Sequence, residues 1–120
     1  MRVLIHSESF KGKPVYGQLG ARRWECEWYE LSKGAQKRFD ADPNYEHDHD
    51  RDEVCRVSIH ATKEAAIEAG RKVAPGSVYG CALVQEHFLD WMVEEDGVGE
   101  WESVGPQFEV DAVDGEVVEV

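Results

Sequence analysis

Two stretches of the chain alternate between apolar and polar residues in the way that half-buried strands do. Residues 22–31 place two tryptophans and a cysteine on one side and two glutamates and a tyrosine on the other. Because successive side chains of a strand point to opposite faces of its sheet, this alternation predicts a strand with one face in the core. Residues 53–60 alternate in the same way, and Cys55 lies on the side expected to face the core. An aliphatic run near the first residue predicts a further strand over residues 3–10.

The segment of residues 62–74 repeats its apolar residues at the spacing of a helix. Thr62 offers a hydroxyl that can cap the first turn, and the pair Pro75-Gly76 ends the pattern. Residues 35–52, which join the first two alternating segments, are polar and include an Asp-Pro-Asn turn signal. We therefore expect one helix at 62–74 and a loop with at most one helical turn at 35–52.

The C-terminal third predicts a series of hairpins. Residues 78–93 fit a helix and a strand about equally well. The Asp-Gly dipeptide at 96–97 is one that two-residue hairpins prefer, and residues 101–112 behind it alternate, so a strand is the more consistent interpretation. A second Asp-Gly dipeptide at 114–115 predicts a last strand over residues 116–120.

These elements follow the order β-β-β-α-β-β-β and predict an α+β fold. We expect a mainly antiparallel sheet of five to six strands, with one amphipathic helix packed on one face. A chain of 120 residues suits one domain with one core, so residues 1–120 are interpreted as a single acidic domain. The aromatic residues expected in this core or at its rim are Trp24, Trp28, Phe88, Trp91, Trp101 and Phe108.

The cysteines and the first residues bear on the compartment. Cys26, Cys55 and Cys81 are odd in number, widely spaced and placed in strand-like segments, so we expect reduced thiols in the core. The aliphatic run at 3–5 is too short for a signal peptide or a membrane-spanning helix. Both features favour a cytoplasmic protein.

Charge is distributed very unevenly along the chain. The formal net charge is −12, and residues 86–120 hold 12 Asp and Glu residues with no Lys or Arg. Direct binding to nucleic acid or to an anionic membrane is not expected, because both require clustered positive charge.

The acidic segment 46–53 is the candidate metal site, because His47 and His49 project to one side of an extended chain between carboxylates. The spacing of a calcium-binding EF-hand loop is absent, since the positions that need Gly and Glu, counted from Asp48, hold Glu53 and Ile59. A zinc site would need two further ligands. A metal-binding or small-molecule-binding domain that uses His47 and His49 therefore stays the alternative function.

Signatures of catalysis and of cofactor binding are absent from the sequence. The chain contains no GxSxG, Walker, GxGxxG or HExxH sequence. We therefore expect neither an enzyme nor a bound cofactor.

Carboxylates on the predicted C-terminal hairpin and in the 46–53 segment are the candidate partner-binding residues. Rows of like charge on paired strands cost stability, and a basic partner would relieve that cost. The simpler interpretation is a charged surface that keeps the protein soluble and its sheet edges unpaired. The candidate residues are Glu94, Glu95, Asp96, Glu100, Glu102, Asp48, Asp50 and Asp52.

In size and acidity the chain resembles small phage-encoded inhibitors of host nucleic-acid machinery, such as anti-CRISPR proteins and DNA mimics, and immunity proteins that block nuclease toxins. The resemblance implies a non-catalytic inhibitor or adaptor that occupies a basic surface of a partner protein, such as one that otherwise holds nucleic acid. It covers no specific motif, so it assigns no role to any residue. An exposed sheet edge would also allow a homodimer.

Overall fold

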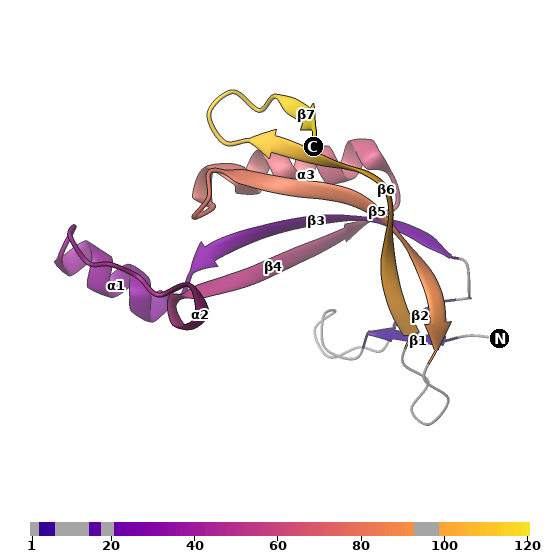
Figure 1. Ribbon diagram of the computed structural model, residues 1–120, viewed down its shortest axis with the longest axis horizontal. Coiled ribbons are helices and arrows are strands. Elements are labelled where there is room, and N and C mark those ends of the chain that lie inside the picture. Colours follow the sequence, from indigo (N-terminus) through magenta and orange to yellow (C-terminus); the bar gives the residue numbers. More distant parts are fainter. Residues whose placement is uncertain (1–2, 7–14, 18–20, 93–98) are drawn as a thin grey trace.

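The computed structural model describes the backbone of residues 3–6, 15–17, 21–92 and 99–120 and the side chains of residues 21–89 and 101–120. Two short strands, β1 (Val3–His6) and β2 (Val15–Gly17), pair with each other in a separate antiparallel sheet. The main sheet has five antiparallel strands in the order β4-β3-β5-β6-β7 (Figure 1). These strands are β3 (Arg22–Leu31), β4 (Glu53–His60), β5 (Cys81–Met92), β6 (Gly99–Asp111) and β7 (Val117–Glu119).

The α+β class and the five-stranded antiparallel sheet are confirmed. The strands predicted at 22–31 and 53–60 are present with those bounds, and residues 81–92 of the ambiguous 78–93 segment form a strand. Helix α3 (Lys63–Val73) begins after Thr62, whose hydroxyl accepts a hydrogen bond from the backbone N–H of Ala65. The expected hairpin turn at 96–97 lies outside the described residues, whereas the second Asp-Gly dipeptide leads into β7 as predicted.

The connection expected to be a loop at 35–52 is largely helical instead. It contains α1 (Lys33–Ala41) and the single turn α2 (His49–Asp52), while a short 3-10 helix, η1 (Ala74–Gly76), follows α3. The side chain of Ser32 caps α1, which buries only Ala35. A helix that buries so little has no apolar stripe, and therefore the sequence pattern missed it. None of the described helices is long and apolar enough to cross a membrane.

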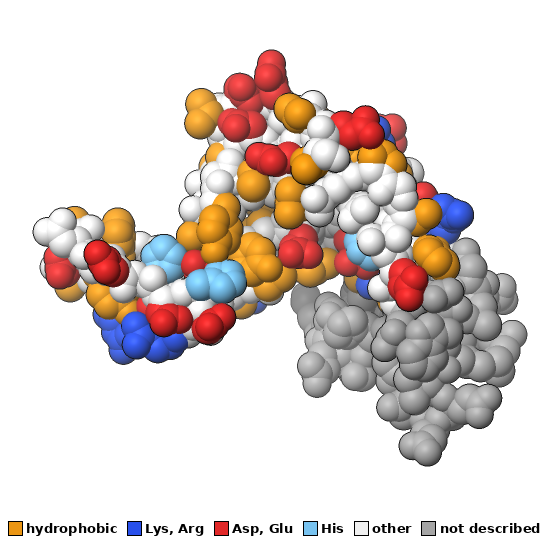
Figure 2. All heavy atoms as spheres, in the orientation of Figure 1, with side chains coloured by type: hydrophobic (Ala, Val, Ile, Leu, Met, Phe, Trp, Pro, Cys, Tyr) orange, Lys and Arg blue, Asp and Glu red, His pale blue; other side chains and the backbone are white. Residues whose placement is uncertain are grey.

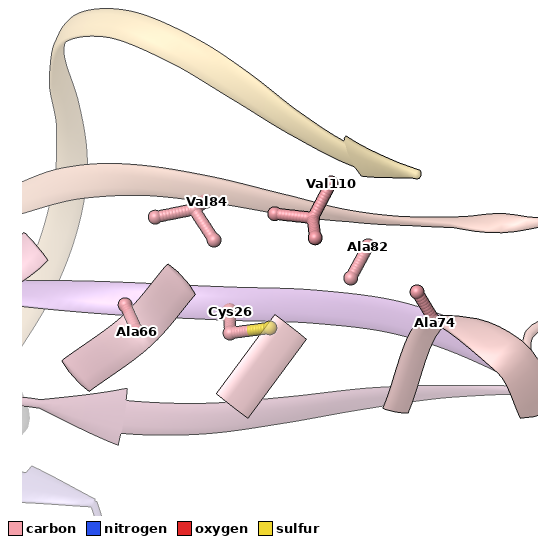
Figure 3. Packing of buried hydrophobic residues seen from close by; sticks show 6 residues of the cluster. All are labelled: Cys26, Ala66, Ala74, Ala82, Val84 and Val110. Carbon is pink, nitrogen blue, oxygen red and sulfur yellow. The ribbon is translucent and has the colours of Figure 1, made fainter. Parts of the chain in front are cut away.

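The main core lies between α3 and one face of the sheet, and its fully buried side chains are small. Figure 3 shows side chains from β3, α3, η1, β5 and β6 that converge there: Cys26, Ala66, Ala74, Ala82, Val84 and Val110. Gly70 allows this close approach, because a Cβ atom at that position would lie 3.1 Å from Cγ2 of Val110. The predicted core aromatics Trp24, Trp28 and Phe108 are partly buried and pack around this centre.

The prediction that Cys55 faces this core is wrong. In the β3–β4 register Cys26 pairs with Ser58, so the even-numbered side chains of β4 share the face of the buried Cys26. Cys55 lies on the opposite face and is exposed. Alternation fixes which residues share a face, but it does not say which face the helix covers.

Candidate functional site

The face of the sheet opposite α3 carries a row of side chains that spans all five strands. Paired positions place Glu27 of β3 between Val57 and Leu83. Leu83 in turn pairs with Glu109, which pairs with Val118 of β7. We call Val57, Glu27, Leu83, Glu109 and Val118 the central row and this side of the sheet the open face. Apolar and acidic side chains therefore alternate from one edge of the sheet to the other.

Apolar side chains of the central row remain in contact with solvent. Val57 is 47% exposed and Val118 is 59% exposed, at opposite edges of the sheet. No described helix covers this face, since α3 packs on the other. On the face shown in Figure 2, hydrophobic side chains gather over the sheet and Asp and Glu side chains lie among them. The open face thus combines exposed apolar area with negative charge.

Negative charge on the open face contributes to a higher pKa of two neighbouring cysteine thiols. Partial desolvation by its strand neighbours and then the charge of Glu27 raise the pKa of Cys55, although its side chain is exposed. Burial and then the charges of Glu109 and Asp111 raise the pKa of Cys81. Each carboxylate disfavours a second negative charge beside it, which is the expected response to like charges.

The positive charge that the described strands place on the open face is paired with a carboxylate. Among the described strand residues, Arg23 supplies this face with its one Lys or Arg side chain. Its Nε atom donates a hydrogen bond of 2.8 Å to Glu25 Oε2. The guanidinium also lies 4.0 Å from the ring centroid of Trp101, a cation–π contact. Asp111, which shares this face, accepts hydrogen bonds from the backbone N–H groups of Val113 and Asp114. Glu27 and Glu109 are the two carboxylates of the central row itself.

A second cluster is centred on Glu53, the first residue of β4, whose side chain is only 3% exposed. Its Oε1 atom accepts a hydrogen bond of 2.6 Å from the Tyr79 hydroxyl and lies 2.7 Å from Nδ1 of His49. Its Oε2 atom lies 2.8 Å from Nε2 of His47. Tyr29 completes the cluster and packs edge-on against the Tyr79 ring at 5.5 Å. We call these residues the Glu53 cluster.

The protonation equilibria of the Glu53 cluster are coupled. Burial acts to raise the pKa of Glu53, but the hydrogen bonds from Tyr79 and the two histidines outweigh it and lower the pKa overall. The hydrogen bond to Glu53 raises the pKa of His49, and the corresponding bond raises the pKa of Tyr79 to about 12. Ionised Glu53 and protonated His49 therefore stabilise each other.

The two histidines of the candidate metal site contact one buried carboxylate. Both predicted histidines direct a ring nitrogen to the same Glu53 carboxylate. Within the part of the chain that the structure describes, no group of three or more His, Cys, Asp or Glu side chains is arranged to hold a metal ion. The sequence identified His47 and His49, but it gave no sign of Tyr79, which lies far from them in the chain.

Three predicted partner-binding residues belong to the 46–53 segment, and they differ in exposure. Asp50 is exposed, and Asp48 caps α2 by accepting hydrogen bonds from the backbone N–H groups of Asp50 and Arg51. Asp52 is 2% exposed, contrary to the expectation of a surface charge. Hydrogen bonds from Arg51, from the backbone N–H of Asp48 and from the Tyr45 hydroxyl hold the pKa of Asp52 well below its usual range. Its charge is satisfied inside the protein.

The other predicted partner-binding residues belong to the C-terminal hairpin. Glu94, Glu95 and Asp96 lie outside the described residues, and for Glu100 only the backbone, within β6, is described. Glu102 is exposed on β6 opposite Phe88. Of these five residues, Glu102 is the one whose side chain the structure describes.

The central row is the feature that sequence reasoning missed. Alternation already placed Glu27 on the face away from the core, which was the available signal. The alignment of Glu27 with Leu83 and Glu109 depends on pairing between distant strands, which a single sequence does not specify. Comparison of the chain with protein-family models, with curated proteins and with solved structures finds no match.

Proposed function

We propose that this chain is a non-catalytic binding protein whose open face engages a basic surface of a partner protein. The central row carries the proposal. It presents Glu27 and Glu109 on either side of Leu83, between exposed valines at both edges. A partner surface with Lys or Arg side chains around an apolar contact would complement both the charge and the apolar area of this row.

The spacing of the row supports a specific contact beyond general solubility. Neighbouring strands lie about 4.8 Å apart, so the strands that carry Glu27 and Glu109 are about 10 Å apart. Their side chains repel each other at low salt, and the cost falls when a cation lies between or beside them. Charges that serve solubility alone need no interleaved apolar side chains.

Surfaces that bind nucleic acid are the class of partner that fits best. Such surfaces concentrate Lys and Arg to neutralise phosphates, and apolar or aromatic side chains accompany these charges where bases stack. A sheet that holds carboxylates at regular intervals can occupy a surface of this kind. The proposed mode of action is inhibitory or adaptor-like: the chain occupies the basic surface and performs no chemistry on it.

Charge reversal on the central row tests the proposal. We expect Glu27→Lys with Glu109→Lys to weaken capture of a partner from an extract of cells that express the chain, by about tenfold or more in affinity. Capture by the wild-type chain should also weaken as salt shortens the Debye length to about 8 Å. The measurement is quantitative pull-down at low and high salt, followed by a binding isotherm with the captured protein.

The matched control is Glu64→Lys with Glu68→Lys on the exposed side of α3. These changes alter the net charge equally but leave the open face intact, so capture should persist. Equal losses for both pairs, or capture that is indifferent to salt, would show that the open face is not the binding surface.

A further inference from the structure

Strand β4 is an unprotected edge of the main sheet. It pairs with β3 over eight consecutive positions with no bulge, and nothing in the described part of the chain pairs along its other side. Figure 1 shows this outer edge directed away from the other four strands. Its sequence contains no proline and no lysine, and three successive residues at its middle, Cys55, Arg56 and Val57, are exposed. Natural sheets usually protect an edge of this length with proline or lysine residues, with a bulge or with a covering element.

The register identifies the backbone groups that point outward. The backbone N–H of Ser32 donates to the carbonyl of Asp52, so this pair is a hydrogen-bonded pair of the β3–β4 ladder. Hydrogen-bonded pairs recur every second residue, and therefore the even-numbered residues of β4 bond to β3. The backbone groups of Cys55, Val57 and Ile59 consequently point away from the sheet.

We propose that β4 pairs antiparallel with β4 of a second copy of this chain, about a two-fold axis at Val57. Both copies of Val57 then form a hydrogen-bonded pair, because their N–H and C=O groups point toward each other. Cys55 lies opposite Ile59 of the second copy, and Arg56 lies opposite Ser58. The two sheets become one sheet of ten strands, and the two central rows join end to end through Val57.

Charge favours a second copy at this edge over the others. The chain has a net charge of −12, so two copies repel each other at most orientations. Strand β4 carries one carboxylate, Glu53, which is covered by the Glu53 cluster, and one arginine, Arg56, which lies 3.4 Å from Glu30. The edge is therefore nearly neutral. By contrast, the opposite edge strand β7 lies in the acidic C-terminal segment, which contains no Lys or Arg.

The same reasoning disfavours one of the neighbouring registers. A shift by one step of the ladder in one direction would place Arg56 opposite Arg56 of the second copy, and directly opposed like charges destabilise a strand pair. In the register centred on Val57, apolar side chains of the two copies lie opposite each other on the open face. On the other face an arginine of one copy lies opposite a serine of the second copy. It contains no opposed like charges.

Proline at the axis tests the proposal. Val57→Pro removes only an N–H that points away from β3, so the monomer should keep its fold while the β4 pair loses both of its central hydrogen bonds. We expect wild-type protein to sediment as a dimer and the Val57→Pro variant to sediment as a monomer with an unchanged circular dichroism spectrum. The control is Glu119→Pro at the outer edge of β7, whose N–H also points outward because Asp111 bonds to Glu116 in that ladder. This control should stay dimeric.

A cross-link keeps the proposal testable if Val57→Pro fails to fold. In a Cys55→Ser background, Val57→Cys should form an intermolecular disulfide under mild oxidation, since Cα atoms of a hydrogen-bonded pair lie about 5.5 Å apart. Glu119→Cys in the same background should cross-link at least tenfold more slowly. A monomeric wild-type protein across the range of concentrations tested, or equal cross-linking at both positions, would overturn the proposal. Both readouts are independent of any binding partner.

Discussion

Glu53 is a carboxylate that the fold removes from solvent and compensates with three donors. The donors come from three different segments: the loop that holds His47, helix α2 with His49, and the residues before β5 with Tyr79. A buried carboxylate without such partners would be strongly destabilising. The Glu53 cluster therefore fastens the α1–α2 connection to the main sheet at the start of β4.

The cluster should give the protein a pH-dependent stability. Hydrogen bonding to Glu53 raises the pKa of His49 in the folded state. Protonated His49 thus stabilises the fold below its unfolded pKa of about 6.5, and this contribution is lost as pH rises through the higher folded value. We expect His49→Gln to lose more free energy of unfolding, relative to wild type, at about pH 5.5 than at about pH 8. Urea denaturation at the two pH values measures the difference.

Other titrating groups act in both proteins and cancel from this comparison. Burial lowers the pKa of His60, so its contribution has the opposite sign in the same pH range. The pKa of Glu53 and that of Asp52 are lowered, and their contributions are lost only as pH falls below about 4. An equal loss at the two pH values would show that His49 is not protonated in the cluster.

Sequence reasoning found two of the five residues of this cluster. The spacing of His47 and His49 predicted that the two imidazoles act together, and both contact Glu53. It did not predict that both imidazoles contact a carboxylate of the next strand. That contact depends on the helical turn α2, which lies directly before Glu53 in the chain. Tyr79 enters only through the tertiary structure, since the backbone N–H of Val78 bonds to the carbonyl of Tyr29.

Helices α1 and α3 have the same kind of N-cap but very different anchorage. Ser32 accepts a hydrogen bond of 3.1 Å from the N–H of Ala35, and Thr62 accepts one of 3.2 Å from the N–H of Ala65. Helix α3 lines the main core, whereas α1 lies at the far end of β3 and leaves Phe39 43% exposed (Figure 1). Loss of either cap should cost about 1 kcal/mol of helix stability.

Removal of the two caps should therefore have different consequences. We expect Thr62→Ala to lower the free energy of global unfolding by about 1 kcal/mol, because α3 folds with the core. Ser32→Ala should leave global unfolding almost unchanged and increase amide exchange within α1 only. Chemical denaturation and hydrogen exchange of both variants distinguish the two outcomes. A matching loss of global stability for Ser32→Ala would mean that α1 unfolds together with the sheet.

This difference also explains which elements the sequence predicted. Helix α3 and strand β3 each bury one face, so burial imposes a period on the sequence that can be recognised. Strand β4 alternates as well, but its apolar residues Cys55, Val57 and Ile59 lie on the open face. Helix α1 is held by local contacts, such as the hydrogen bond between Gln36 and Asp40, which leave no such period. Strand β2 has only three residues, too few for any alternation to appear.

Repulsion between the carboxylates of the central row should lower the stability of the isolated protein, and added salt should remove this effect. Glu27 and Glu109 flank Leu83 on the open face. At about 0.01 M ionic strength the Debye length is about 30 Å, so their repulsion is hardly screened, and at about 1 M it is screened almost completely. We expect Glu109→Gln to raise the melting temperature at the lower ionic strength and to leave it unchanged at the higher one.

The matched control for that experiment is Glu68→Gln. Glu68 lies 3.5 Å from Arg71 on the exposed side of α3, so its neutralisation removes a weak ion pair and relieves no repulsion. No gain is expected at either ionic strength. A gain of the same size in both variants would assign the effect to net charge alone and not to the central row.

Composition predicted the acidity of this surface but not its position. The sequence directed attention to the 94–102 turn, whereas the described acidic row runs across the strands through Glu27 and Glu109. Strand order is the missing information, because β3 pairs with β5 across the whole β4–α3 connection. No local pattern specifies a pairing between segments so far apart.

The same strand order has a kinetic consequence. The strands β5, β6 and β7 are consecutive in the chain and pair with their neighbours, so they can form a meander early at low entropic cost. Pairing of β3 with β5 must instead close a long loop that contains β4 and α3, and contacts of that kind slow folding. We therefore expect docking of the β3–β4 pair, which places Cys26 beside Val84, to limit the folding rate. Until it occurs, the apolar faces of β5 and β6 stay exposed, so the nascent chain passes through a state prone to aggregation before its acidic surface is complete.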